Sequence, residues 1–171
     1  DPHALAAIDA AHLRPDAGSS VQGLRVEYFR GRKLAGSPVL TRTDATIEFK
    51  WYRGSPTSDL VARGEVPADR AMSNDDFSAR WTGLLVPPAT GDYELTVTGD
   101  DGFRLLVDGN AVIDEWTTTS RARARSAHVT LEAGKAVSLK LEYFEAERDA
   151  EIRLSWKLPG ARPPFDEALD A

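Results

Sequence analysis

The sequence predicts an all-β fold, an antiparallel β-sandwich, and three observations support it. Hydrophobic and polar residues alternate in at least seven short runs between residues 24 and 157, and a period of two is typical of strands with one buried face. Turn sequences rich in Gly, Pro and Asp separate these runs. The length of 171 residues suits one compact domain with a sizeable core. Many short strands joined by turns favour a sandwich or a barrel.

The alternation defines the strands in chain order. Within each run the apolar residues lie two positions apart, so they share one face of the strand. These residues are Leu24, Val26 and Tyr28; Ile47, Phe49 and Trp51; Phe77, Ala79 and Trp81; Tyr93, Leu95 and Val97; Phe103, Leu105 and Val107; Val137, Leu139, Leu141 and Tyr143; and Ile152, Leu154 and Trp156.

Turns are predicted at residues 86–93, 107–112 and 131–137. In the second, the pair Asp108-Gly109 lies between two strand-like runs. A tight hairpin needs a positive φ there, and glycine adopts it at little cost.

Both ends depart from the alternation. Residues 3–14 are rich in alanine and predict a short helix, and the following RPDAGSS predicts a linker. We therefore predict a flank or linker over residues 1–21, the sandwich over 22–160, and a C-terminal flank over 161–171 that begins a truncated helix. This organisation is typical of a module belonging to a larger protein.

Composition excludes several classes of function. The formal charge of −6 disfavours nucleic acid as a partner, because that binding depends on positive charge. No apolar run approaches the roughly 20 residues of a membrane-spanning helix, so we expect no membrane association. There is no cysteine, which rules out disulfides and thiolate metal sites. The first residues do not form a signal peptide.

Several stretches match one known family in order. They are GLRVEYFRG, PVLTRTD, FSARWTGLLVPPATGDYELTVTGDDGFRLLVDGNAVIDEW, VTLEAGKAVSLKLEYFE and AEIRLSW. Over roughly residues 22–159 the chain resembles the protective-antigen-type PA14 domain, particularly the version inserted in β-glucosidase-like enzymes of glycoside hydrolase family 3. The resemblance implies a jelly-roll-type antiparallel sandwich, in agreement with the strand pattern.

The resemblance implies two possible roles. In adhesins of the family, the domain binds sugars through calcium, which is held by two consecutive aspartates joined by a cis peptide and by an asparagine from a later loop. In the family 3 enzymes it acts as a lid over the catalytic pocket. The second role implies a β-linked glucoside or oligosaccharide as ligand and the catalytic barrel and α/β domains of a parent enzyme as partners. It also favours a periplasmic or extracellular location.

Asp100 and Asp101 match the adhesin pair, which makes them the candidate calcium ligands. Calcium takes 6 to 8 oxygen ligands, so other loops must contribute. The loops after Trp116 contain no asparagine; Asp114, Glu145, Glu147 or Asp149 could replace it only by adding charge. We therefore favour a turn in which one aspartate accepts hydrogen bonds from the turn's own amides and Gly102 supplies an unusual conformation. On this interpretation no cofactor is expected, and calcium is the alternative.

No catalytic residues are predicted within the chain. Glycosidases need two carboxyl groups on either side of one bond, whereas adjacent residues of an extended strand point to opposite faces. The histidines form no Ser/His/Asp pattern. Any catalysis would belong to a parent enzyme, a glycoside hydrolase of the β-glucosidase type.

Sugar binding is expected in two loops, residues 117–125 and 145–149. Aromatic rings stack on the C–H face of a pyranose, and charged side chains bind its hydroxyls. Trp51, Trp81 and Trp156 belong to the core, whereas Trp116 opens a polar loop; its packing against the sandwich edge is the favoured alternative. The candidate residues are Trp116, Arg121, Arg123, Glu145, Glu147 and Arg148. Arg121, Arg123 and Arg125 alternate, and a solvated strand is favoured over recognition of a uronic acid.

The preferred functional hypothesis is a non-catalytic lid that selects substrates for a family 3 β-glycosidase. The alternatives are a calcium-dependent lectin and a structural spacer or dimerisation module.

Overall fold

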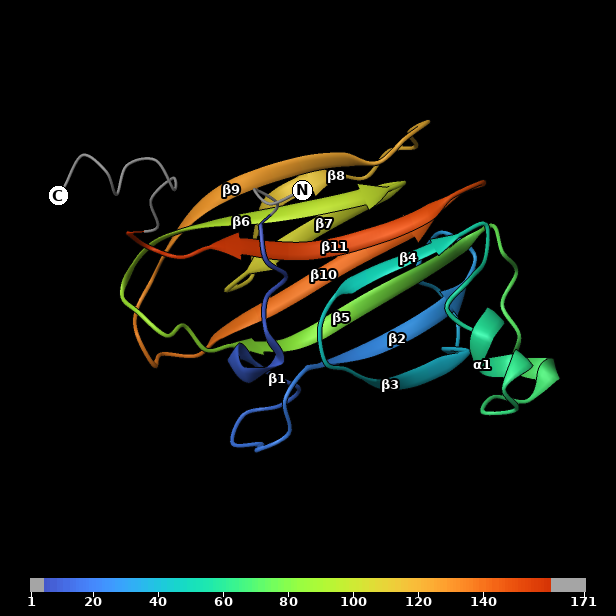
Figure 1. Ribbon diagram of the computed structural model, residues 1–171, viewed down its shortest axis with the longest axis horizontal. Coiled ribbons are helices and arrows are strands. Elements are labelled where there is room, and N and C mark those ends of the chain that lie inside the picture. The colour runs from blue at the N-terminus through green and yellow to red at the C-terminus, as the bar shows by residue number, and fades with distance from the viewer. Residues whose placement is uncertain (1–4, 161–171) are drawn as a thin grey trace, which may run out of the picture.

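The computed structural model describes residues 5–160, which form two antiparallel sheets packed face to face (Figure 1). The larger sheet has the order β3-β2-β5-β10-β7-β8, and β1 pairs with β5 beside this path. The smaller sheet has the order β4-β11-β6-β9. The predicted all-β sandwich is confirmed.

Each predicted strand is present. The strands of the larger sheet are β1 (Leu13–Arg14), β2 (Leu24–Arg30), β3 (Leu40–Asp44), β5 (Phe77–Leu85), β7 (Gly102–Val107), β8 (Asn110–Glu115) and β10 (Val137–Glu145). Those of the smaller sheet are β4 (Glu48–Tyr52), β6 (Gly91–Asp100), β9 (Arg123–Leu131) and β11 (Ala150–Lys157). The helical elements are short: η1 (Ala10–His12), α1 (Ser58–Ala62) and η2 (Ala68–Arg70).

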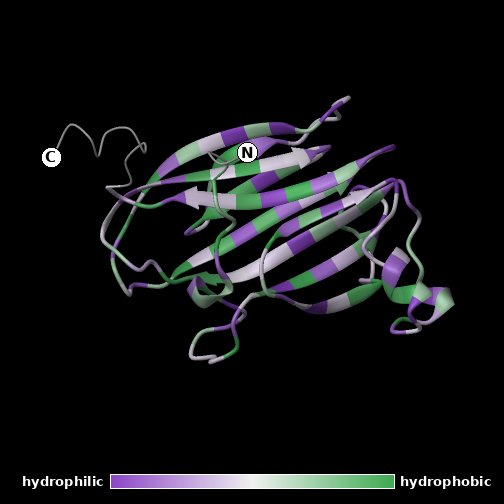
Figure 2. Cartoon of the chain, viewed as in Figure 1, coloured by the Kyte–Doolittle hydropathy of each residue, from purple (hydrophilic) through white to green (hydrophobic). Residues whose placement is uncertain are grey.

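The core lies between the sheets, where the alternating apolar residues meet. Figure 2 shows the resulting bands of hydrophobic and hydrophilic residues along the strands. Trp81, Tyr93 and Phe103 are fully buried. Trp156 is also buried, and Trp51 packs against the core from a partly buried position, as predicted for these two tryptophans.

A buried carboxylate, Asp44, lies at the end of β3 inside the larger sheet. Its Oδ2 accepts hydrogen bonds from the Tyr28 hydroxyl (2.6 Å) and from Trp81 Nε1 (2.9 Å). Its Oδ1 accepts one from Arg42 Nε (2.7 Å). Three donors thus compensate the burial of one charge, which would otherwise be unfavourable.

The N-terminal segment differs from its prediction. The helix expected over residues 3–14 is reduced to the single 3-10 turn η1, because residues on either side pair with strands. Ile8 N donates to Leu154 O (3.1 Å), and Trp156 N donates to Ala6 O (3.3 Å). The segment therefore pairs with the part of β11 that lies beyond its pairing with β4. Ile8 and Leu13 are 1% exposed and belong to the core.

The predicted hairpin at Asp108-Gly109 is present, and both residues have positive φ, 52° and 80°. Two successive positive φ values are typical of the type I′ turn that joins twisted strands.

No helix of residues 5–160 is long and apolar enough to cross a membrane. The helical pattern expected within residues 161–171 lies outside the described residues.

Candidate functional site

Three carboxylates meet at one end of the sandwich. Asp100 ends β6, Asp101 connects it to β7, and Glu145 ends β10. The pairing of Gly102 with Phe144 in β7 and β10, and the hydrogen bond from Asp101 N to Phe144 O (3.1 Å), bring the β6–β7 connection to the end of β10. One oxygen from each carboxylate lies within 4.8 Å of the other two, and all three residues are buried.

This geometry corrects two sequence-based interpretations. The Asp100-Asp101 peptide bond is cis, and the two carboxylates do not lie on opposite faces, as an extended strand would place them. Asp101 does not accept from the amides of its own turn: Oδ1 accepts from Thr119 N (2.8 Å) and Oδ2 from Ala146 N (2.7 Å). Asp101 therefore connects the two loops that follow β8 and β10.

Gly102 is needed for close packing and not for an unusual φ, which also differs from the prediction. A Cβ atom at this position would lie 2.0 Å from the Phe144 ring. Only glycine lets β7 approach β10 this closely at the acidic cluster.

Two oxygens of the acidic cluster have no donor within residues 5–160 to compensate their burial. Among the described residues, Asp100 Oδ1 and Glu145 Oε1 are buried without a hydrogen-bond partner. The Tyr143 hydroxyl donates to the Asp100 carbonyl oxygen (2.5 Å) and lies 3.3 Å from Glu145 Oε2. Burial, followed by the charges of Asp101 and Asp100, raises the pKa of Glu145 to about 9. Burial, followed by the charge of Asp101, raises the pKa of Asp100 to about 7.

These pKa shifts predict how the stability of the metal-free domain depends on pH. A carboxyl with a raised folded-state pKa keeps its proton when the unfolded chain has lost it, so stability falls as pH rises between the two values. For Glu145 the interval runs from 4.5 to about 9. We expect the melting temperature in EGTA to fall steadily from pH 5 to pH 9. A melting temperature that rises over this range would contradict the assignment of these shifts.

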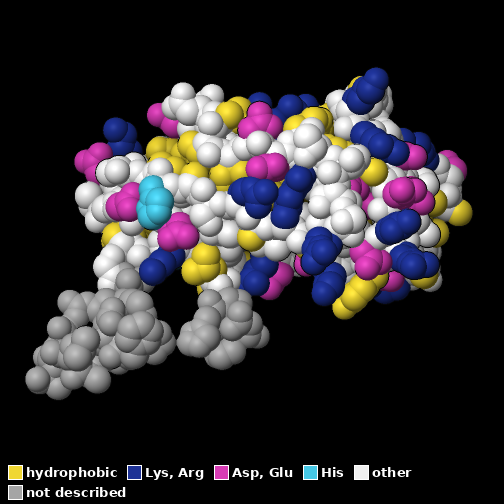
Figure 3. All heavy atoms as spheres, turned by 90° about the horizontal axis from the view of Figure 1, so that it is seen from above, with side chains coloured by type: hydrophobic (Ala, Val, Ile, Leu, Met, Phe, Trp, Pro, Cys, Tyr) yellow, Lys and Arg dark blue, Asp and Glu magenta, His cyan; other side chains and the backbone are white. Residues whose placement is uncertain are grey.

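A cavity of about 860 Å³ opens beside the carboxylates. Asp100 and Asp101 line it together with residues 118–122, which precede β9, and residues 146–149, which follow β10. Figure 3 shows Lys and Arg side chains, with acidic ones among them, gathered at the end of the molecule away from the grey residues. In Figure 1 this is the end at which β6 and β10 finish and β11 begins.

The carboxylates fit a hard divalent cation. Calcium binds oxygen ligands, carboxylates above all, and two of the buried oxygens have no other partner among the described residues. Glu145, one of the four acids that could complete the site in place of an asparagine, is the third member of the cluster. A cation here would also neutralise charges that otherwise repel one another.

A family model, the PA14 domain, matches residues 20–168. The chain belongs to the PA14 domain family. This confirms the relationship predicted from the sequence motifs.

Relatives of this PA14 domain occur in different proteins. It is 35% identical over 134 residues to the anti-sigma-I factor RsgI3 of Acetivibrio thermocellus, covering 78% of this chain and 19% of that protein. It is 36% identical over 129 residues to a β-glucosidase of Rhizobium radiobacter, covering 70% of this chain and 14% of the enzyme. The chain thus spans about a fifth or less of these relatives.

A solved structure described as a PA14 sugar-binding domain from an RTX adhesin has the same fold. Its TM-score is 0.64 at 21% identity, over 84% of this chain and 93% of that one.

The predicted sugar-binding residues of the PA14 domain separate into two groups. Arg121, Glu147 and Arg148 line the cavity, and Glu145 is buried in the adjacent carboxylate cluster. Trp116 is not among the lining residues: its ring contacts Phe144 (centroids 4.8 Å apart), and the Arg104 guanidinium lies 4.0 Å from its centroid. Trp116 therefore packs against the sandwich edge, the alternative that the sequence favoured.

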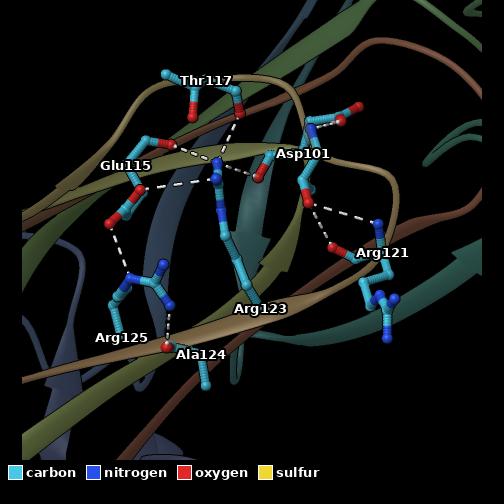
Figure 4. A network of polar contacts seen from close by, with 8 residues as sticks. Asp101, Glu115, Thr117, Arg121, Arg123, Ala124 and Arg125 are labelled. Atoms are coloured by element: carbon cyan, nitrogen blue, oxygen red, sulfur yellow. Dashed lines mark hydrogen bonds and ion pairs between the residues drawn. The ribbon is translucent and has the colours of Figure 1, made fainter.

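Arg123 supports the cavity without lining it (Figure 4). Its Nη2 donates to the carbonyl oxygens of Glu115 (3.0 Å) and Thr117 (2.6 Å), and more weakly to that of Asp101 (3.5 Å). Figure 4 also shows Arg125 bound to the Glu115 carboxylate, at 2.8 Å. Arg123 thus holds the loop after β8 in place and Arg125 binds the last residue of β8, whereas Arg121 reaches the cavity.

Residues from two other segments of the cavity wall were not predicted from the sequence. Arg32 follows β2, Lys50 and Tyr52 belong to β4, and Arg53 follows β4. Tyr52 continued the alternating pattern as a polar-side position, so the alternation indicated its exposure but gave no sign that β4 ends beside the acidic cluster.

Proposed function

We propose that this PA14 domain is a non-catalytic carbohydrate-binding module that holds a calcium ion with Asp100, Asp101 and Glu145. The observation that carries the proposal is the buried cluster of three carboxylates, two of them with unpartnered oxygens, beside a cavity. Such a cluster is unfavourable without a counter-ion.

The protein groups leave room for a ligand in the calcium coordination. Three carboxylates supply at most six oxygens, and two of these already accept hydrogen bonds from Thr119 and Ala146. Bound calcium would attract and orient the hydroxyl oxygens of a sugar. Asp101 would couple the ion to the loops after β8 and β10, because it accepts hydrogen bonds from Thr119 N and Ala146 N. Both loops would then be held beside the ion.

The relatives support a carbohydrate ligand. The adhesin domain with the same fold is described as sugar-binding. The name of the bacterial β-glucosidase indicates that this relative acts on β-glucosides. We infer that the ligand is a β-linked glucoside or oligosaccharide and that the domain acts outside the cytoplasm.

Binding to an array of immobilised glycans tests this function. The fluorescently labelled domain should bind a subset of glycans in calcium chloride and lose them in EGTA. Magnesium at the same concentration is the control, because it demands a tighter octahedral site and releases its water reluctantly. Binding that is unchanged by EGTA would contradict the role of calcium, and the absence of any bound glycan would contradict the module's function.

A second candidate is the lid of a β-glycosidase, which the 36% identity to the β-glucosidase favours. The cavity loops would then cover a catalytic pocket that lies in another domain. Deleting residues 118–122 in the full-length enzyme should change the ratio of kcat/KM values for short and long oligosaccharides. An unchanged ratio would mean that residues 118–122 have only a structural role in the enzyme.

A further inference from the structure

Tyr52 lines the cavity with an exposed aromatic ring and an unusual backbone conformation. Tyr52 is 62% exposed, whereas most large hydrophobic residues of the described chain are buried. Tyr52 has φ of 56°, in the left-handed region that bulky residues rarely occupy. Departures of this kind cluster at ligand sites, where the surrounding structure maintains them.

The pairing of β4 with β11 accounts for the position of the ring. Tyr52 pairs with Ala150 and Lys50 pairs with Glu151, so β4 carries one extra residue, Trp51, over this step. Such a bulge bends a strand and redirects its side chains. Trp51 packs into the core while Tyr52 turns to the cavity. The Lys50 ammonium lies 5.4 Å from the centroid of the Tyr52 ring and supports one of its faces.

The sheet register sets the distance between Tyr52 and the carboxylates. Along neighbouring strands, Tyr52 pairs with Ala150, and the next residue, Glu151, pairs with Asp100. Tyr52 and Asp100 are thus two strands apart, roughly 10 Å between backbones. A disaccharide spans such a distance and a single pyranose does not. The cavity volume of about 860 Å³ is also ample for more than one sugar ring.

We propose that Tyr52 is the stacking platform of a second sugar subsite, so that the domain binds oligosaccharides in preference to monosaccharides. This inference rests on the proposed function, in which the first sugar lies at the cation. The second ring places its C–H face on the open face of Tyr52. Gluco-configured pyranoses suit this arrangement, because their hydroxyls are equatorial and both ring faces carry only C–H groups.

Calorimetric titration of the calcium-loaded domain tests the subsite. The probes are glucose against cellobiose, and galactose against lactose as a second series. The wild type should bind the disaccharide of at least one series more tightly than its monosaccharide. Tyr52→Ala should weaken disaccharide binding roughly tenfold and change monosaccharide binding by less than twofold.

Two variants serve as controls. Tyr52→Phe keeps the ring and should bind like the wild type. Leu158→Ala removes another exposed apolar side chain, after the far end of β11, and should have no effect on binding.

The outcomes separate this inference from the proposed function. Calcium-dependent binding that Tyr52→Ala leaves unchanged, or weakens equally for both sugars, would overturn the subsite and leave the proposed function intact. A wild type that binds none of the four sugars in calcium would overturn the subsite, and the proposed function fails with it only if the glycan array shows no ligand either. Thermal shift in calcium should be equal for the wild type and Tyr52→Ala, because the ring is not a ligand of the ion.

Discussion

Glu145→Gln is expected to abolish the thermal stabilisation of the domain by calcium and to raise the melting temperature of the metal-free form at neutral pH. Both effects have one cause. Glu145 is fully buried beside Asp100 and Asp101, and its Oε1 has no partner among residues 5–160. The neutral amide removes the cost of burying a third acidic group and also removes a calcium ligand.

The size of the calcium effect follows from mass action. Calcium at a hundredfold excess over its Kd should stabilise the wild type by about 2.7 kcal/mol. For a domain of this size that corresponds to a rise of about 5–10 °C in melting temperature. Differential scanning calorimetry in calcium and in EGTA, at pH 7.5, measures both quantities for the wild type and the variant.

Glu147→Gln is the matched control, because this exposed acid lies two residues after Glu145, in the loop that follows β10. It removes the same charge from the cavity wall and should leave the calcium response intact. Equal loss of the response in both variants would show that overall charge attracts the ion, without a defined site at Glu145. A full response in Glu145→Gln would refute the assignment of this residue as a ligand.

Asp44→Ala is expected to lower the free energy of unfolding by roughly 3–5 kcal/mol, the range for a broken buried charged pair. The substitution leaves the Tyr28 hydroxyl and Trp81 Nε1 inside the sheet without their acceptor. It also leaves Arg42 without its carboxylate. Urea denaturation followed by tryptophan fluorescence measures the loss.

Asp114→Ala provides the comparison, since Asp114 is an exposed acid on β8, and its replacement should change stability by less than about 0.5 kcal/mol. A loss below 1 kcal/mol for Asp44→Ala would mean that water replaces the carboxylate. The hydrogen bonds of Asp44 would then contribute little to stability.

The strands and turns of this fold could be predicted because they depend on local sequence. Alternation places Leu95 and Val97 on one face whatever their partners are, and Asp108-Gly109 favours its turn by backbone preference alone. The edge strands β3, β8 and β9 were not among the seven runs, since their exposed or half-exposed residues weaken the alternation. The role of Arg123 is also hidden, because its guanidinium binds backbone carbonyl groups, which no side-chain pattern records.

The candidate site was predicted only in part, because it depends on register. Asp100 and Asp101 were recognised as a motif, but their environment requires knowing that Gly102 pairs with Phe144, more than forty positions along the chain. Glu145 was one of four acids that could complete the cluster, and the sequence could not distinguish it from Glu147 on the same loop. The alternation indicates that Tyr52 is exposed, but its place at the cavity depends on a bulge in β4, which leaves no period in the sequence.

The N-terminal segment has a practical consequence for handling this domain. The family match begins at residue 20, yet Ala6, Ile8 and Leu13 provide backbone pairing and buried side chains to both sheets. A fragment beginning at residue 20 would expose unpaired backbone groups along part of β11 and part of β5. Such open strand edges pair readily with other chains. We expect such a fragment to self-associate in size-exclusion chromatography, whereas one beginning at residue 5 should elute as a single species. A monomeric fragment from residue 20 would show that the segment is dispensable.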